Sequence, residues 1–244
     1  MGRAAMSEWA QERFWKAAEA SQTENGFTVH LDGRAIKTPA KAALVVPSLG
    51  LAKAIAEEWD AQEGKIDPRT MPVTRTANAA IDKVVPQFAE VADMIAAYGD
   101  ADLLCYRATQ PDELVAHQAA TWDPFLQWAQ TELGVALTPV AGLMHKPQSP
   151  EALAELSCRT SAMSAFELAA FHDLVSLSGS LILGFAATFD VWKGSNLWEI
   201  SQLDEIWQRK QWGRDEDAVA AAEIKAAAFL DAKRFYDLCN LPAK

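Results

Sequence analysis

The sequence predicts an α+β protein in which a small antiparallel β-sheet with packed helices comes first and an all-helical domain follows. Apolar and polar residues alternate from Phe27 to Leu31, which is the period-two pattern of a half-buried strand. After Pro111 almost every apolar residue recurs with helical spacing. Strands grouped before helices favour an α+β fold over an alternating α/β fold. We therefore divide the 244 residues into an N-terminal α+β domain, residues 1–109, and a C-terminal helical domain, residues 110–244.

The predicted sheet is built around a β-hairpin. Asp32 and Gly33 follow the first strand, and this dipeptide accepts the positive φ angles of a tight hairpin turn at low cost. The turn leads into a second strand over residues 34–38, and residues 43–46 supply a third strand. A helix that carries Leu51, Ile55 and Trp59 at helical spacing follows the sheet.

Helical periodicity then continues to the end of the chain. The expected helices cover residues 72–84, 86–99, 115–133, 150–160, 164–189, 196–211 and 215–238. The pair Asp123-Pro124 interrupts the third of these, either as the start of a new helix or as a proline kink. Within 164–189, Ser176, Ser180 and Gly184 recur every four residues. We interpret them as a small-residue stripe that lets another helix approach closely.

Composition excludes several classes of protein. The net charge is −11 and no run of Lys and Arg reaches four residues, which disfavours nucleic-acid binding because such proteins carry basic patches. The three cysteines are far apart and odd in number, so neither a disulfide framework nor a zinc site is indicated. The N-terminus does not resemble a signal peptide. The longest uncharged apolar stretch, residues 174–189, is shorter than a membrane span. We expect a soluble protein without membrane insertion.

No catalytic signature is present in the sequence. The four histidines are isolated, and the chain contains no HExxH, GxSxG, EF-hand or phosphate-binding glycine motif, which are the patterns that carry metal, nucleophile or nucleotide chemistry. We therefore expect no catalytic residue, no metal and no cofactor. One alternative stays open: neighbouring carboxylates, such as those of Asp204 and Glu205 or of Asp215 and Asp217, serving a small-molecule hydrolase in a cleft between the two domains.

The segment 195–218 is the strongest candidate for a binding surface. On one continuous helix, a single face would carry Trp198, Gln202, Glu205, Arg209 and Trp212. Trp and Arg are enriched where binding energy concentrates, so this pattern indicates a surface for a protein partner. The alternative is that both tryptophans pack into the domain while the charged side chains point outward.

Six stretches of the chain resemble one known family. They are EEWDAQEGKIDP (57–68), MPVTRTANAAID (71–82), YGDADLLCYRA (98–108), ATWDPFLQWA (120–129), SGSLILGFA (178–186) and LDEIWQRKQWGRDEDA (203–218). In this order and combination they are similar to the F-type ATP synthase assembly chaperones that bind the α subunit, the "ATP twelve" family. The resemblance implies a chaperone, not an enzyme, whose partner is the unassembled α subunit until the β subunit replaces it.

The same resemblance implies roles for individual residues. The acidic residue of the family's C-terminal region matches Glu205 best, with Asp204 beside it, so both join the expected contact surface. Trp59 and Asp60 lie in the EWD motif, and Trp122 and Gly179 lie in two further motifs. We expect a structural role for these four. The resemblance also implies a bacterial, cytoplasmic member, which we expect to be monomeric when free.

Overall fold

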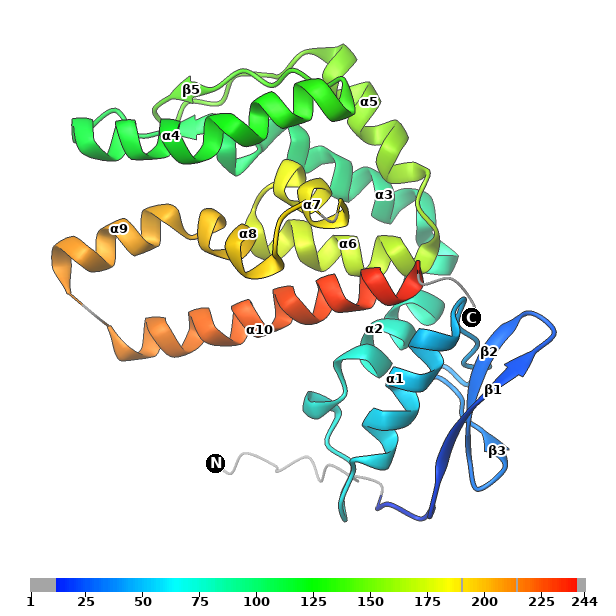
Figure 1. Cartoon of the computed structure of the whole chain (residues 1–244). Helices are drawn as coiled ribbons and strands as arrows, with labels where there is room; N and C mark the ends of the chain where they lie inside the picture. The colour runs from blue at the N-terminus through cyan, green and yellow to red at the C-terminus, as the bar shows by residue number, and fades with distance from the viewer. Residues whose placement is uncertain (1–11, 190, 214, 241–244) are drawn as a thin grey trace, which may run out of the picture.

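The computed structural model of the chain describes residues 12–189, 191–213 and 215–240. A small antiparallel sheet near the N-terminus is followed by a body made mainly of helices (Figure 1). The α+β fold class is therefore confirmed. The division of the chain between residues 109 and 110 stays a prediction.

The sheet has the strand order β1-β2-β3 and is antiparallel throughout. Its strands are β1 (Ala18–Thr23), β2 (Gly26–Leu31) and β3 (Arg34–Ala35). Asp32 and Gly33 turn the chain between β2 and β3 with φ angles of 46° and 82°, as a tight hairpin turn requires. The predicted hairpin is confirmed.

The structure differs from the predicted sheet in three details. The second strand, predicted over residues 34–38, is limited to Arg34–Ala35. The strand β1 was not expected, because its sequence AEASQT has no large apolar residue to mark one face. Residues 43–46 do not form a third strand; they join the sheet through the isolated bridges of Ala43 to Lys37 and of Val46 to Phe27, and the Thr28 hydroxyl donates to the Leu44 carbonyl at 2.6 Å.

Ten α-helices and several short turns make up most of the described chain. They are α1 (Leu49–Asp60), α2 (Pro72–Ala79), α3 (Phe88–Ala96), α4 (Asp112–Trp128), α5 (Pro150–Ser161), α6 (Ala165–Ser178), α7 (Leu181–Thr188), α8 (Gly194–Ser201), α9 (Leu203–Trp212) and α10 (Glu216–Cys239). The short strands β4 (Tyr106–Arg107) and β5 (Val140–Ala141) pair in parallel. Helix α4 runs through Pro124, so a new helix does not start there.

The helix predicted over residues 164–189 is two helices, which corrects the small-residue stripe. Gly179 ends α6 with a φ of 71°, and the Ser180 hydroxyl caps α7 by accepting a hydrogen bond from the backbone N–H of Leu183 at 3.0 Å. Gly184 then packs back against α6: a Cβ at this position would lie 2.5 Å from Cγ2 of Val175. The close approach is therefore real, but it involves Gly184 alone across a turn between two helices.

Helix α10 joins two hydrophobic cores. One core lies between the sheet and α1 and includes Phe235 of α10. The other lies among the helices α3 to α8 and includes Phe229 and Ala232 of α10. In Figure 1, α10 passes between α1 and α2 on one side and α6 and α8 on the other. The last helix of the chain thus fixes the N-terminal sheet to the helical body.

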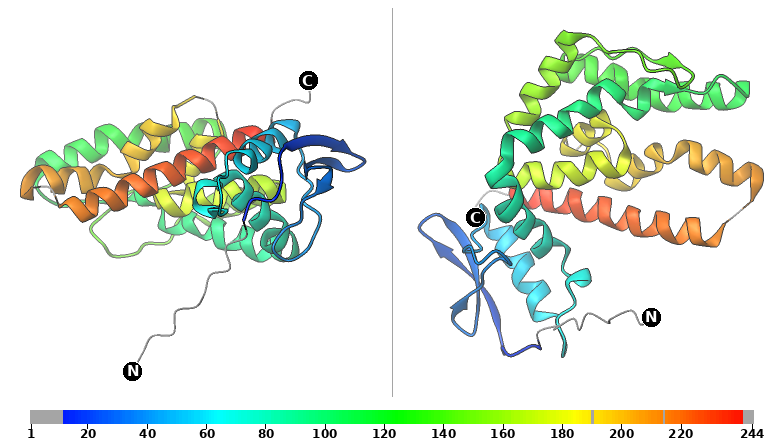
Figure 2. Two further views of the ribbon diagram at one scale, coloured as in Figure 1. Left: turned by 90° about the horizontal axis from the view of Figure 1, so that it is seen from below. Right: turned by 180° about the vertical axis from the view of Figure 1, so that it is seen from behind.

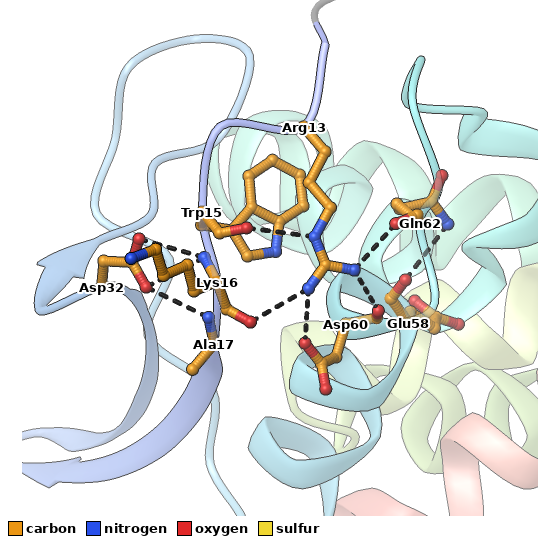
Figure 3. A network of polar contacts seen from close by, with 8 residues as sticks. All are labelled: Arg13, Trp15, Lys16, Ala17, Asp32, Glu58, Asp60 and Gln62. Atoms are coloured by element: carbon orange, nitrogen blue, oxygen red, sulfur yellow. Dashed lines mark hydrogen bonds and ion pairs between the residues drawn. The ribbon is translucent and has the colours of Figure 1, made fainter.

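The segment before β1 is fixed to the end of α1 by Arg13 (Figure 3). Its guanidinium donates to the carbonyls of Trp15, Lys16, Asp60 and Gln62 and to the Asp60 carboxylate, the last at 3.0 Å. Trp15 packs edge-on against Trp59, with ring centroids 5.1 Å apart. The EWD motif therefore lies at the junction between α1 and the start of the sheet.

Glu58, the first residue of that motif, lies in α1 and caps the N-terminus of the next helix, α2. Its carboxylate accepts hydrogen bonds from the backbone N–H groups of Val73 and Thr74, each at 2.7 Å. Both N–H groups belong to the first turn of α2, where backbone N–H groups have no acceptor within the helix. One short motif thus contributes to three contacts: the α2 N-terminus, the Trp15 ring and the Arg13 guanidinium.

Candidate functional site

The tip formed by α9 and the first half of α10 is a largely exposed part of the helical body. We define the hairpin tip as residues 203–213 and 215–228. In α9 only Leu203 is buried, and the buried residues of α10 all lie at or after Phe229. Figures 1 and 2 show α9 and α10 extending away from the sheet, on the same side as α4. A helical hairpin with so little buried surface is free to contact a partner.

Helix α4 positions the base of this tip. The buried Gln118 accepts a hydrogen bond from the Ala108 N–H at 2.7 Å and donates one to the Asp204 carboxylate, also at 2.7 Å. One turn further along α4, the indole N–H of Trp122 donates to the carbonyl of Ile200 at 3.0 Å. These bonds attach both α8 and α9 to α4. Asp204 is therefore half-buried and holds the start of α9.

The continuous helix predicted through the candidate surface does not exist. Helix α8 ends at Ser201, and Gln202 adopts φ −98° and ψ 17° before α9 begins. Trp198 consequently turns into the core, where it is 8 % exposed and its ring centroid lies 5.8 Å from that of Phe229. The expectation that Trp198 and Trp212 share an exposed face is wrong.

The other predicted contact residues lie on α9 and reach the surface. Glu205 is exposed, and the Arg209 Nε donates to the backbone carbonyl of Glu205 at 3.3 Å. Trp212, the last residue of α9, is 82 % exposed. The structure therefore brings three of the five predicted contact residues onto the exposed hairpin tip, with Asp204 at its base and Trp198 beneath it.

The hairpin tip combines exposed apolar side chains with acidic ones. Ile224 on α10 is 72 % exposed, and Val219 lines an open groove together with Ile206, Arg209 and Lys210 of α9. Asp215 caps α10 by accepting from the N–H groups of Asp217 and Ala218, and further acidic residues follow in the first turn. The sequence analysis did not identify Ile224, because the alanine-rich helix around it has no strong apolar stripe.

The remaining motif residues lie inside the molecule. Trp122 is fully buried and lies under the guanidinium of Arg107, 5.4 Å from the ring centroid. Arg107 in turn pairs with Asp123 at 2.7 Å. Gly179 ends α6, as described above. These positions surround the junction of α4, α6 and α7 rather than an open surface.

A buried carboxylate, which the sequence analysis did not identify, connects two of the six stretches that resemble the chaperone family. Asp102 is completely buried and accepts hydrogen bonds from the N–H groups of Leu104 and Ile182 and from the Ser180 hydroxyl, at 2.8–3.0 Å. The backbone carbonyl of Gly179 accepts from the Leu103 N–H at 3.1 Å. The stretches 98–108 and 178–186 are therefore joined at the N-terminus of α7. Burial raises the pKa of the Asp102 carboxyl to about 6, against the lowering effect of these hydrogen bonds.

The raised pKa of Asp102 predicts a pH-dependent stability. Since the folded-state pKa lies above the ordinary 3.8, the folded protein holds this proton more tightly than the unfolded chain does. Its stabilising contribution is full below about pH 4 and is lost as the pH rises through about 6, a change of at most about 3 kcal/mol. Asp102→Asn is neutral throughout, so the stability of the wild type relative to this variant should fall as the pH rises from 4 to 7.

Urea unfolding of both proteins at several pH values measures this difference. Because the other carboxyl groups titrate equally in both proteins, their contributions cancel. Glu132→Gln, at an exposed carboxyl of the turn after α4, serves as the control for the loss of one carboxyl group. A constant difference between the wild type and Asp102→Asn would contradict the prediction.

Neither a metal centre nor the carboxylates proposed for a hydrolase form a reaction site in the described part of the chain. Within residues 12–189, 191–213 and 215–240, no three His, Cys, Asp or Glu side chains are grouped to hold a metal. Asp204 is bound by Gln118 and Asp215 caps a helix. Over the same residues every helix is too short or too polar to span a bilayer.

The comparisons with known proteins agree with this arrangement. A family model described as ATP12 chaperone protein matches residues 12–130. The crystal structure of Atp12 from Paracoccus denitrificans is 45% identical, covers 96% of this chain and 100% of its own, and has a TM-score of 0.92. A crystal structure of an Agrobacterium tumefaciens protein is 39% identical over 91% of this chain and 85% of its own, with a TM-score of 0.85. Protein atp12, mitochondrial, of Schizosaccharomyces pombe is 27% identical over 84% of this chain and 75% of its own length.

The 45% identity to the Paracoccus protein over nearly the whole of both chains shows the family. The matching family model describes its members as chaperones. The hydrolase alternative has no support in these relatives. The chain belongs to the ATP12 family of chaperones for ATP synthase assembly and is not an enzyme.

Proposed function

We propose that this chaperone binds the unassembled α subunit of the F-type ATP synthase and keeps it soluble until the β subunit takes its place. The observation that carries the proposal is the hairpin tip, where Trp212 and Ile224 expose most of their apolar surface on α9 and on the first half of α10, which bury little of their own surface. A tryptophan at the centre of a protein interface contributes more binding energy than most other residues. An anchor of this kind suits a reversible contact with an apolar client surface.

The exposed interface of the client explains why this chaperone needs a binding surface and no reaction centre. A ring subunit without its neighbours exposes a large apolar interface, and exposed apolar surface of that size leads to aggregation. Covering that interface requires shape, apolar anchors and solubilising charge, and no bond has to change. The net charge of −11 keeps the complex soluble by repulsion between copies. A cytoplasmic location and a monomeric free state complete the proposal.

Co-expression tests the proposal directly. The isolated α subunit is produced with and without this chain, and the soluble fraction and any complex are measured by centrifugation and gel filtration. We expect soluble α subunit and a one-to-one complex only when the chaperone is present. The β subunit, produced in the same way, is the specificity control and should not be retained. Equal aggregation of the α subunit in both cultures would refute the proposal.

A further inference from the structure

We propose that the free edge of strand β1 is a second client-contact site, which binds an extended, basic segment of the client by adding it to the sheet as a strand. This inference rests on the proposed function for the identity of the client. It concerns the opposite end of the molecule from the hairpin tip, and it is carried by the register of the sheet, the groove beside β1 and the charges of that groove.

The register shows which backbone groups of β1 are unpaired. Phe27 exchanges both of its backbone hydrogen bonds with Val46, and the Val29 carbonyl accepts from Ile36. The backbone groups of Phe27 and Val29 therefore point away from β1, and those of the alternate residues, Thr28 and His30, point toward it. Neighbouring residues of a strand direct their backbone N–H and C=O groups to opposite sides. The backbone groups of β1 therefore alternate in the same way between pointing toward β2 and pointing outward.

Three residues of β1 consequently present both N–H and C=O to the outside. Ser21 and Glu19 lie opposite Thr28 and His30 and form backbone hydrogen bonds with β2. The backbone groups of Ala18, Ala20 and Gln22 therefore point away from β2. Among the described residues, no backbone or side-chain group bonds to these outward N–H and C=O groups. An unpaired row of this kind is a template for another strand.

The space beside this edge is open because β1 carries small side chains. Ala18 and Ala20 lie opposite Leu31 and Val29, which are buried, so both alanines face α1. An open groove runs there between strand and helix. It is lined by Ala18, Glu19, Ala20, Lys53, Ala56, Glu57 and Asp60. Alternate side chains of an added strand would enter this groove, since strand side chains alternate between the two faces.

Charge selects the occupant. On the α1 side of the β1 edge, the groove presents the carboxylates of Glu57 and Asp60 and the ammonium group of Lys53. The side chain of Glu19, which lies between Ala18 and Ala20 along the strand, points to the opposite face of the same edge. Arg13 already pairs with Asp60 at 3.0 Å, whereas Arg234 lies 4.0 Å from Glu57, at the outer limit of an ion pair. Glu19 and Glu57 therefore favour a segment that carries Lys or Arg. A second copy of this chain would bring the same acidic edge and the same net charge of −11, which disfavours pairing of two β1 edges.

Amide hydrogen exchange at single-residue resolution tests the site in the full chain, alone and with the isolated α subunit. In the complex we expect the outward amides of Ala18, Ala20 and Gln22 to exchange at least about tenfold more slowly. The amides of Glu19, Ser21 and Thr23 already bond to β2 and should not change. Protection confined to the outward set is the signature of an added strand.

Variants separate the site from general stability. Ala20→Pro removes one outward donor without removing a β1–β2 hydrogen bond, since proline is tolerated where the N–H faces outward on an edge strand. We expect its affinity for the α subunit to fall about tenfold, while Ala20→Ser, which keeps the N–H, stays within about twofold of the wild type. Thermal unfolding checks that both variants fold.

A charge variant covers the case in which the proline variant does not fold. Glu19→Lys combined with Glu57→Lys reverses one charge on each face of the β1 edge and should weaken binding at least about fivefold. Glu63→Lys, at an exposed position outside the groove, is the control and should bind like the wild type.

Each other outcome overturns the inference. A complex that forms without slower exchange at the outward amides would leave the proposed function intact and remove this site. Absence of any complex would overturn both. Slow exchange of these amides in the free chain would show another occupant: a second copy if the protection increases with concentration, or the chain's own N-terminal residues if it does not.

Discussion

Replacement of Trp122 by alanine is expected to lower the free energy of unfolding by about 4 kcal/mol, as large-to-small changes at fully buried aromatic residues do. The side chain has no exposed surface, packs under the Arg107 guanidinium and donates to the Ile200 carbonyl. Alanine leaves a cavity and removes the donor from a carbonyl in the last turn of α8. Denaturant unfolding followed by circular dichroism measures the loss.

The contribution of the hydrogen bond is separable from that of the ring. Trp122→Phe keeps most of the apolar volume but removes the indole N–H, and we expect a smaller loss of about 1–3 kcal/mol, the cost of leaving the partly buried Ile200 carbonyl without this donor. Trp212→Ala is the matched control, since the same chemical change at an 82 % exposed residue should cost less than about 0.5 kcal/mol. Equal losses at both tryptophans would contradict the account of Trp122.

The hairpin was predictable because its determinants are adjacent in the sequence. Asp32 and Gly33 specify a turn, and the alternation from Phe27 to Leu31 specifies a buried face. β1 has neither signal. Its position is set by pairing with β2, a contact between segments that the local pattern of AEASQT does not encode. The fold class followed from strong local signals, and the missing strand from a weak one.

Helical periodicity located the candidate surface but not its geometry. A period of 3.6 residues continues across a break, so the pattern alone does not reveal that Gln202 ends one helix and starts another. Trp198 is buried because Phe229 lies beside it, and Phe229 belongs to α10, a distant part of the chain. Similarly, the turn at Gly179 and Ser180 depends on the buried Asp102. These contacts join segments far apart in sequence, which periodicity does not report.

The exposed residues were predicted better than the buried ones for a physical reason. Glu205, Arg209 and Trp212 lie after the break on the same helix, α9, so their relative spacing survives. Ile224 faces solvent on a helix whose first half buries no side chain in the described structure. An exposed isoleucine becomes recognisable only when its environment is known.

Trp212→Ala is expected to weaken binding of the ATP synthase α subunit by about thirty-fold, or about 2 kcal/mol, as truncation of an interface tryptophan does. Stability should be unchanged, because the side chain contributes little to the core. Glu205→Lys should weaken binding in the same direction by placing a positive charge on the contact surface. Titration calorimetry with the purified subunit, or retention of soluble α subunit on co-expression, measures both effects.

The control for Trp212 must be equally exposed and apolar but lie outside the hairpin tip. Leu143, in the loop after β5, is 92 % exposed and belongs to neither α9 nor α10, so Leu143→Ala should bind the client like the wild type. Glu132→Lys, at an exposed residue of the turn after α4, controls for the charge reversal in Glu205→Lys. If Leu143→Ala weakened binding as much as Trp212→Ala, exposed apolar area in general would be responsible rather than the hairpin tip. If all four variants bound normally, the client would contact another surface, because no compensating apolar anchor of similar size is exposed on α9 among the described residues.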